Sequence, residues 1–164
     1  MRLEPPRPYA ATIQSLQFEE EGDISTIASI DEDGLPAGNL EGPNDLGGSA
    51  TVITGIIPYS FGSLGPASFA PFSWSSSGLP SLSSLGEALK FTVSPSGKTL
   101  AAMTEDGQTA LHLTVTDIDT GAYRLTLRAP LDHPITGSED DLAFSVKYTI
   151  RDNQNNQASA RLGI

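Results

Sequence analysis

The sequence of 164 residues contains no cysteine. This absence excludes a disulfide framework and a thiolate metal site, so extra stability must come from the core, from a bound metal or from neighbouring domains. No segment has the apolar length that spans a bilayer, and residues 1–8 lack the apolar core of a secretory signal peptide. We therefore expect no membrane insertion.

Basic residues are scarce and unevenly placed. The chain has 9 Lys and Arg against 20 Asp and Glu, a formal net charge of −11, and no Lys or Arg lies between Arg7 and Lys90. Such a surface repels phosphate backbones, which argues against nucleic-acid binding, and it attracts divalent cations. The alternative explanation for this acidic charge is that it serves solubility alone. The acidic residues of that stretch are Glu19, Glu20, Glu21, Asp23, Asp31, Glu32, Asp33, Glu41, Asp45 and Glu87.

The motifs of common catalytic sites are also missing. The sequence has neither a Gly-x-Ser-x-Gly elbow nor a phosphate-binding Gly-x-x-x-x-Gly-Lys loop. Of its two histidines, His112 falls on the polar face of a predicted strand and His133 precedes Pro134 in a predicted loop. Pairs of carboxylates hydrolyse glycosides only at a defined separation, which a sequence does not give. We therefore expect that the protein is not an enzyme.

The chain is instead rich in short segments of alternating polarity, separated by turn residues. Residues 142–150 show the clearest pattern, since Leu142, Phe144, Val146, Tyr148 and Ile150 alternate with polar or small residues over nine positions. A period of two over this length predicts a strand with one buried and one solvated face. Similar but shorter strands are predicted at 11–18, 50–61, 68–75, 88–93, 99–103, 111–116, 123–127 and 158–164.

The remaining segments predict linkers and loops. Residues 1–10 are rich in proline, 19–33 form an acidic connection, and 34–48 and 75–86 are rich in Gly, Pro, Asn or Ser. No window shows an apolar stripe of helical period. Short strands at near-regular spacing predict an all-β fold, an antiparallel β-sandwich.

Short motifs follow one another in a fixed order along most of the chain. They are DEDGLPAGN at 31–39, GPNDL at 42–46, SW at 73–74 leading to SGLP at 77–80, GEA at 86–88, LTVTD at 113–117, TGAY at 120–123, LDHP at 131–134 and YTIRD at 148–152. In this order and at these separations they resemble the tandem repeat of giant bacterial adhesins of the RTX type, which are secreted by a type I apparatus. The match covers about residues 31–164.

The resemblance implies an Ig-like or cadherin-like β-sandwich at 31–164, preceded at 1–30 by a linker with a candidate first strand. It implies a structural extender repeat, secreted and displayed on the bacterial cell surface, that serves attachment and biofilm formation and is rigidified by calcium. The expected partners are neighbouring repeats of the same chain, and an isolated repeat is expected to be a monomer.

A ligand-binding module of the same adhesin is the alternative function. Loops 34–48 and 75–86, together with Phe69, Phe72 and Trp74, would then hold a glycan or a peptide. Aromatic residues of this kind also form sandwich cores, which is the other explanation for them.

Calcium prefers six to eight oxygen ligands, and the carboxylates that supply them fall into groups. One group, Asp132, Glu139, Asp140 and Asp141, precedes the strongest strand, and Asp152 follows it. Nine residues of strand span about 30 Å, so Asp152 cannot join the others, and two separate ends of the sandwich are implied.

A second group of carboxylates, Asp31, Glu32 and Asp33, precedes Gly34 without matching an EF-hand; a flexible linker is its alternative explanation. The related repeats tend to carry several Asp residues in the turn after the penultimate strand. Here residues 152–156 contain one carboxylate, which argues against tight calcium binding at Asp152. The segment from Asp117 to Gly121 predicts a plain hairpin turn.

Overall fold

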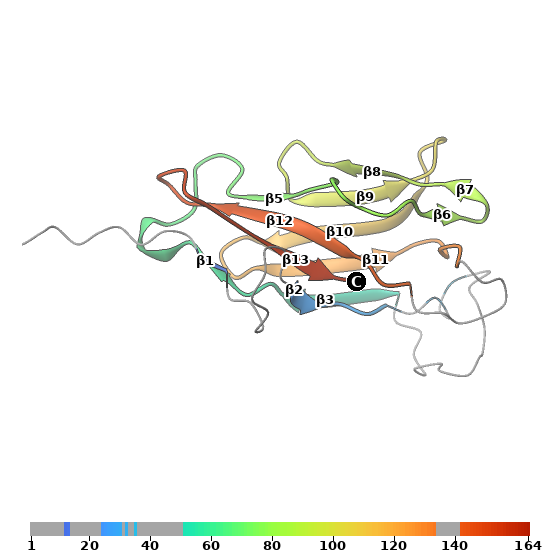
Figure 1. Cartoon of the computed structure of the whole chain (residues 1–164), viewed down its shortest axis with the longest axis horizontal. Coiled ribbons are helices and arrows are strands. Elements are labelled where there is room, and N and C mark those ends of the chain that lie inside the picture. The colour runs from blue at the N-terminus through green and yellow to red at the C-terminus, as the bar shows by residue number, and fades with distance from the viewer. Residues whose placement is uncertain (1–11, 14–23, 31, 33–34, 36–50, 134–141) are drawn as a thin grey trace, which may run out of the picture.

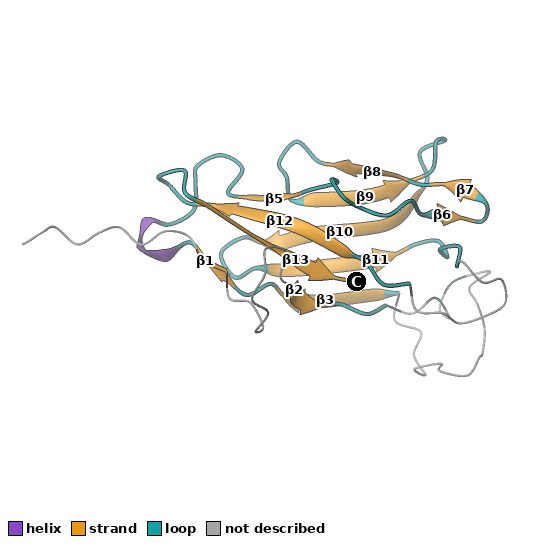
Figure 2. Ribbon diagram, in the orientation of Figure 1, coloured by secondary structure: helices purple, strands orange, loops and turns teal. Residues whose placement is uncertain are grey.

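A computed structural model describes residues 12–13, 24–30, 32, 35, 51–133 and 142–164 (Figure 1). Apart from the one-turn 3-10 helix η1, its regular elements are strands (Figure 2). In chain order these elements are β1 (Thr12–Ile13), β2 (Ile24–Ile27), β3 (Val52–Ile56), β4 (Tyr59–Ser60), η1 (Gly62–Leu64), β5 (Phe72–Trp74), β6 (Ser83–Ser84), β7 (Glu87–Ala88), β8 (Lys90–Val93), β9 (Thr99–Met103), β10 (Thr109–Asp117), β11 (Ala122–Leu127), β12 (Ser145–Arg151) and β13 (Gln157–Gly163).

Two sheets make up the sandwich. One has five strands in the order β3-β11-β10-β9-β8, and the other has four in the order β2-β13-β12-β5. All neighbours within them pair antiparallel except β2 and β13, which run parallel. The immunoglobulin fold has similar neighbours. Its third strand lies in one sheet with its last two, as β5 does with β12 and β13, and its second lies with the fifth and fourth, as β3 does with β11 and β10. The predicted antiparallel, Ig-like β-sandwich is confirmed, with the β8–β9 hairpin widening one sheet.

The core lies between the two sheets and is built by alternation along the long strands. Lys147, in the middle of β12, is exposed, while its neighbours Val146 and Tyr148 are fully buried. This arrangement confirms the two-sided strand that the sequence predicts. The other long strands bury Leu111, Leu113 and Val115 on β10, Tyr123, Leu125 and Leu127 on β11, and Ala160 and Leu162 on β13.

Aromatic side chains fill one part of this core. Phe72 stacks on Tyr148 with ring centroids 5.5 Å apart, and Trp74 meets both rings edge-on. The Trp74 indole Nε1 donates a hydrogen bond of 2.9 Å to the carbonyl of Lys98, which satisfies its polar atom in the interior. Phe72 and Trp74 are therefore core residues, and only Phe69 of the predicted aromatic group is exposed.

Several segments differ from the prediction. The predicted strand 50–61 is divided into β3 and β4, and β5 begins at Phe72 rather than Ser68. β2 lies inside the predicted acidic connection 19–33, and β6 lies inside the predicted loop 75–86. β12 begins at Ser145 rather than Leu142, although the main chains of Phe144 and Ile164 still exchange two hydrogen bonds of 2.8 Å. β2 has the sequence ISTI, which does not alternate in polarity, so its pairing with β13 leaves no mark in the sequence.

No helix within the described residues is long and apolar enough to cross a membrane.

Candidate functional site

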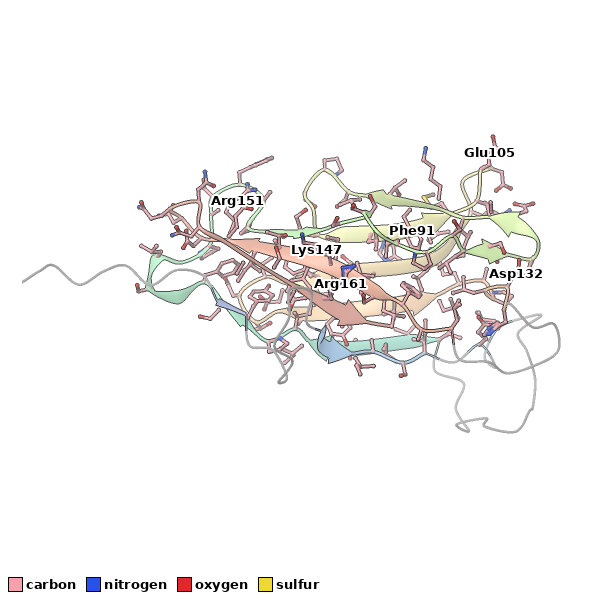
Figure 3. All side chains as sticks on the ribbon, in the orientation of Figure 1. Phe91, Glu105, Asp132, Lys147, Arg151 and Arg161 are labelled. Atoms are coloured by element: carbon pink, nitrogen blue, oxygen red, sulfur yellow. The ribbon has the colours of Figure 1, made fainter. Side chains whose placement is uncertain are left out.

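The long axis of the sandwich ends in two chemically different poles (Figure 3). The turn pole consists of the loop 65–71 and the turn 152–156, next to Arg151. The acidic pole consists of Glu32, the segment 131–133 and the turn between β6 and β7. Figure 3 shows Arg151 toward one end and Asp132 at the other. Asp132 and the neighbour of Arg151, Asp152, therefore lie at opposite ends, as the strand length predicts.

Glu32 anchors its segment to the acidic pole. Its Oε1 atom accepts a hydrogen bond of 2.8 Å from the backbone N–H of Leu131 and lies 3.6 Å from Nε2 of His133. Its Oε2 atom is buried and has no hydrogen-bond partner within the described part of the chain, and the side chain is only 15% exposed. A carboxylate oxygen withdrawn from water without a donor is unfavourable, so this atom is suited to a cation or a bound water.

Asp132 lies between the two residues that Glu32 contacts. Its backbone N–H donates to the carbonyl of Ser83, and its Oδ2 atom accepts a hydrogen bond of 2.8 Å from the N–H of Gly86. The hydroxyl of Ser83 and then the N–H of Gly86 lower the pKa of Asp132 by stabilising its ionised form. The carboxylate is therefore charged and held in place by the turn between β6 and β7.

The structure thus brings together two acidic segments that the sequence presents as separate candidates. Among the described residues, no group of three His, Cys, Asp or Glu side chains is close enough to hold a metal ion. Of the carboxylates at this pole, Glu32 has one buried oxygen without a partner among the described residues, and Asp132 is held as an anion by Ser83 and Gly86. The other predicted ligands, Asp31, Asp33, Glu139, Asp140 and Asp141, lie outside the described residues.

Asp152, at the turn pole, uses its carboxylate to close its own turn. The side chain is fully buried. Oδ1 accepts hydrogen bonds from the N–H groups of Gln154 and Asn156, at 2.9 and 3.0 Å, and Oδ2 accepts one of 2.9 Å from the Asn156 amide. Both oxygens are occupied within the turn. This arrangement favours a structural role for Asp152 over the metal-binding role that its position in the sequence suggests.

A pocket of about 530 Å³ opens beside this turn. Phe69 lines this pocket, with 76% of its surface exposed. The sequence suggests Phe69 either as a ligand contact together with Phe72 and Trp74 or as a core residue, but it does not predict this pocket, because the two loops that form it are 82 positions apart (69 and 151) and no motif links them. The lining residues are Ala67, Ser68, Phe69, Arg151, Asp152, Asn153, Gln154 and Asn155.

The segment from Asp117 to Gly121 is a hairpin turn, as predicted. Oδ1 of Asp117 accepts hydrogen bonds from the N–H groups of Asp119 and Thr120, at 2.9 and 3.3 Å. The N–H of Gly121 closes the turn on the Asp117 carbonyl. Of the loop predicted as a ligand contact at 34–48, only Leu35 is among the described residues.

No protein-family model, curated protein or solved structure matches the chain in the three comparisons made. The resemblance to adhesin repeats therefore stays a hypothesis.

Proposed function

We propose that this domain is a non-catalytic extender repeat of a large secreted adhesin on the bacterial cell surface, rigidified by calcium at its acidic pole. The observation that carries the proposal is the parallel pairing of β2 with β13. β1 lies toward the turn pole, where Thr12 and Ile13 pair with Ser60 and Tyr59 just before η1. β2 and β13 then both run toward the acidic pole (Figure 1).

This geometry suits a domain that is loaded along its length. β2 begins toward the turn pole and β13 ends toward the acidic pole. A force that pulls β2 backward from its start and β13 forward from its end therefore shears the two strands against each other. Shear must break several hydrogen bonds at once, including the one of 2.8 Å from the N–H of Ala28 to the carbonyl of Gly163. β13 is also paired over seven positions with β12, from Arg151↔Gln157 to Ser145↔Gly163. The leaving strand is therefore held on both sides.

Force spectroscopy on the whole chain tests the extender role. Pulling from the two termini is expected to require a clearly higher unfolding force than pulling through handles at Ser63 and Gln154, which lie at the same pole and leave the β2–β13 ladder unloaded. Handles at these two exposed positions do not enter the core. Equal forces in both geometries would contradict the extender role, because the shear ladder would then carry no load.

Calcium at the acidic pole would neutralise the Glu32 and Asp132 carboxylates and fix the angle to a neighbouring repeat. Extracellular calcium modules have dissociation constants of about 0.1–1 mM. At ten times that concentration one site adds about 1.4 kcal/mol by mass action, which corresponds to a rise of roughly 3–6 °C in Tm for a domain of this size. Magnesium is expected to do less, since it sheds water reluctantly.

Two double variants of equal charge separate a specific site from screening. Glu32→Gln with Asp132→Asn is expected to abolish most of the calcium shift, whereas Glu105→Gln with Asp119→Asn, both exposed and outside the acidic pole, is expected to keep it. Differential scanning fluorimetry with calcium, magnesium and NaCl at matched ionic strength measures both variants. A shift that NaCl reproduces, or one that the first variant retains, would refute the calcium site.

A further inference from the structure

The pocket at the turn pole combines an exposed aromatic ring with a group of amides. Phe69 is 76% exposed at the pocket, and the side chains of Asn153, Gln154 and Asn155 are exposed on the facing turn. A ring face takes up apolar C–H surface, and amides both donate and accept hydrogen bonds. The combination is suited to a ligand that has one apolar face and a rim of hydroxyl groups.

The two loops that form the pocket are fixed to each other. The N–H of Ala67 donates to the carbonyl of Arg151, the N–H of Asn153 donates to the carbonyl of Gly65, and both bonds are 3.0 Å long. Pro66 and Asp152 also form an antiparallel bridge. With the Asp152 carboxylate closing the turn, the pocket exists before any ligand arrives, so little ordering free energy is lost on binding.

Two residues beside the pocket have strained backbones. Ala70, next to Phe69, has φ 45°, and Asn155 in the turn has φ 65°. Residues other than glycine adopt positive φ at a cost, and such positions gather at ligand sites. The strain at Ala70 sets the direction of the chain directly after the exposed ring.

The electrostatics of the pocket disfavour a cation. Asp152 is the one carboxylate in its lining, and its two oxygens are buried and already bonded within the turn. The other charged lining residue is Arg151, whose guanidinium faces the Gln157 amide oxygen once that amide is oriented for hydrogen bonding, at 3.1 and 3.3 Å. The lining thus offers hydrogen-bond donors and one positive charge.

We propose that this pocket binds a glycan through a single pyranose ring stacked on Phe69, with Asn153, Gln154 and Arg151 contacting its hydroxyl groups. A pyranose has an apolar face of axial C–H groups and equatorial hydroxyls around its edge, which match an exposed ring beside exposed amides. Arg151 of this site and Asp132 lie at opposite ends of the domain (Figure 3), and Glu32 is bonded beside Asp132 at Leu131, so the site does not depend on calcium binding or on an extender role.

The test is an NMR titration of the whole chain with free sugars. The probes are the methyl glycosides of glucose, galactose, mannose, N-acetylglucosamine and glucuronic acid. At least one is expected to shift the amide signals of residues 67–69 and 151–155 selectively, with a millimolar dissociation constant. Shifts confined to other residues, no shift at tens of millimolar sugar, or saturation only by peptides would overturn the proposal.

Three variants then assign the binding to the aromatic face. Phe69→Ala is expected to weaken binding about tenfold, the loss of one stacked ring, while Phe69→Tyr keeps the ring and the affinity. Leu85→Ala is the control, since Leu85 is a similarly exposed apolar residue, at 67%, located at the acidic pole. Wild-type affinity in Phe69→Ala would refute the site. Because Phe69 is exposed, the variant is expected to keep the wild-type melting temperature, which serves as the check on folding.

Discussion

Replacing Asp152 with alanine tests whether this buried carboxylate is a structural element or a metal ligand. The change removes an acceptor from the N–H groups of Gln154 and Asn156 and from the Asn156 amide. It also loosens a turn whose neighbours hold the loop 65–71, through the bond from the N–H of Asn153 to the carbonyl of Gly65. The expected result is a large loss of stability with no change in calcium response.

The magnitude follows from the three hydrogen bonds. Each bond to a charged acceptor contributes about 1.5–3 kcal/mol when buried. The donors come from residues whose side chains are exposed, so water replaces part of the loss and the three contributions do not add fully. We expect a net loss of about 2–4 kcal/mol. An unfolding entropy of about 2.1 cal/mol/K per residue converts this loss to a fall in Tm of roughly 6–12 °C.

Chemical denaturation and calorimetry measure the loss, and two variants serve as comparisons. Asp152→Asn keeps one oxygen for the two backbone N–H groups but turns an NH2 group toward that of Asn156, so about half of the loss is expected. Asp119→Ala removes an exposed carboxylate from another turn and is expected to lie within about 0.5 kcal/mol of wild type. The reasoning is refuted if Asp152→Ala is as mild as Asp119→Ala, or if chelating calcium from wild type reproduces the Asp152→Ala phenotype.

Two further predictions concern the core and the turns. Ile150→Ala, which empties a fully buried position on β12, is expected to lower the free energy of unfolding in urea by about 2–5 kcal/mol. Lys147→Ala, on the exposed face of the same strand, is expected to leave it nearly unchanged. The reverse order would mean that the strand faces are misassigned. Gly121 and Gly107 both have positive φ, but a Cβ at Gly121 collides with the carbonyl oxygen of Ile57, whereas one at Gly107 meets no atom within 4 Å. Gly107→Ala is therefore expected to lose about 1–2 kcal/mol of stability, the ordinary strain of a left-handed residue, and Gly121→Ala is expected to lose clearly more when both are compared by thermal unfolding. Equal losses would show that the close contact at Gly121 relaxes freely.

The strands that build the core could be predicted because each has one buried and one solvated face. On β10, Leu111, Leu113 and Val115 are buried, and β9 spans the predicted range from Thr99 to Met103. The hairpin turns at Ser94–Gly97 and Asp117–Gly121 also occur where the sequence places them. In these segments local preference and tertiary packing agree, so a short window of sequence contains the information.

The segments that the sequence did not predict are those whose structure depends on distant partners. β2 has no alternation of its own and is defined by its hydrogen bonds to β13, far along the chain. Phe69 and Phe72 lie three positions apart in the same short segment of small and aromatic residues, yet Phe72 is fully buried and Phe69 is exposed. What separates them is the attachment of the loop 65–71 to Arg151 and Asn153, a contact that no local pattern reports.

The acidic pole follows from the same long-range pairing. Since β2 runs parallel to β13, the residues after Ile27 continue toward the end of the sandwich where the segment 131–133 lies, and Glu32 meets Leu131 there. An antiparallel β2 would carry the acidic segment to the turn pole instead. The direction of one short edge strand thus places Glu32 against the segment that contains Asp132 and His133, and gives the domain one pole with these two carboxylates and one that offers an aromatic ring and amides. A cation and a neutral ligand would therefore bind at opposite ends, each without screening or blocking the other.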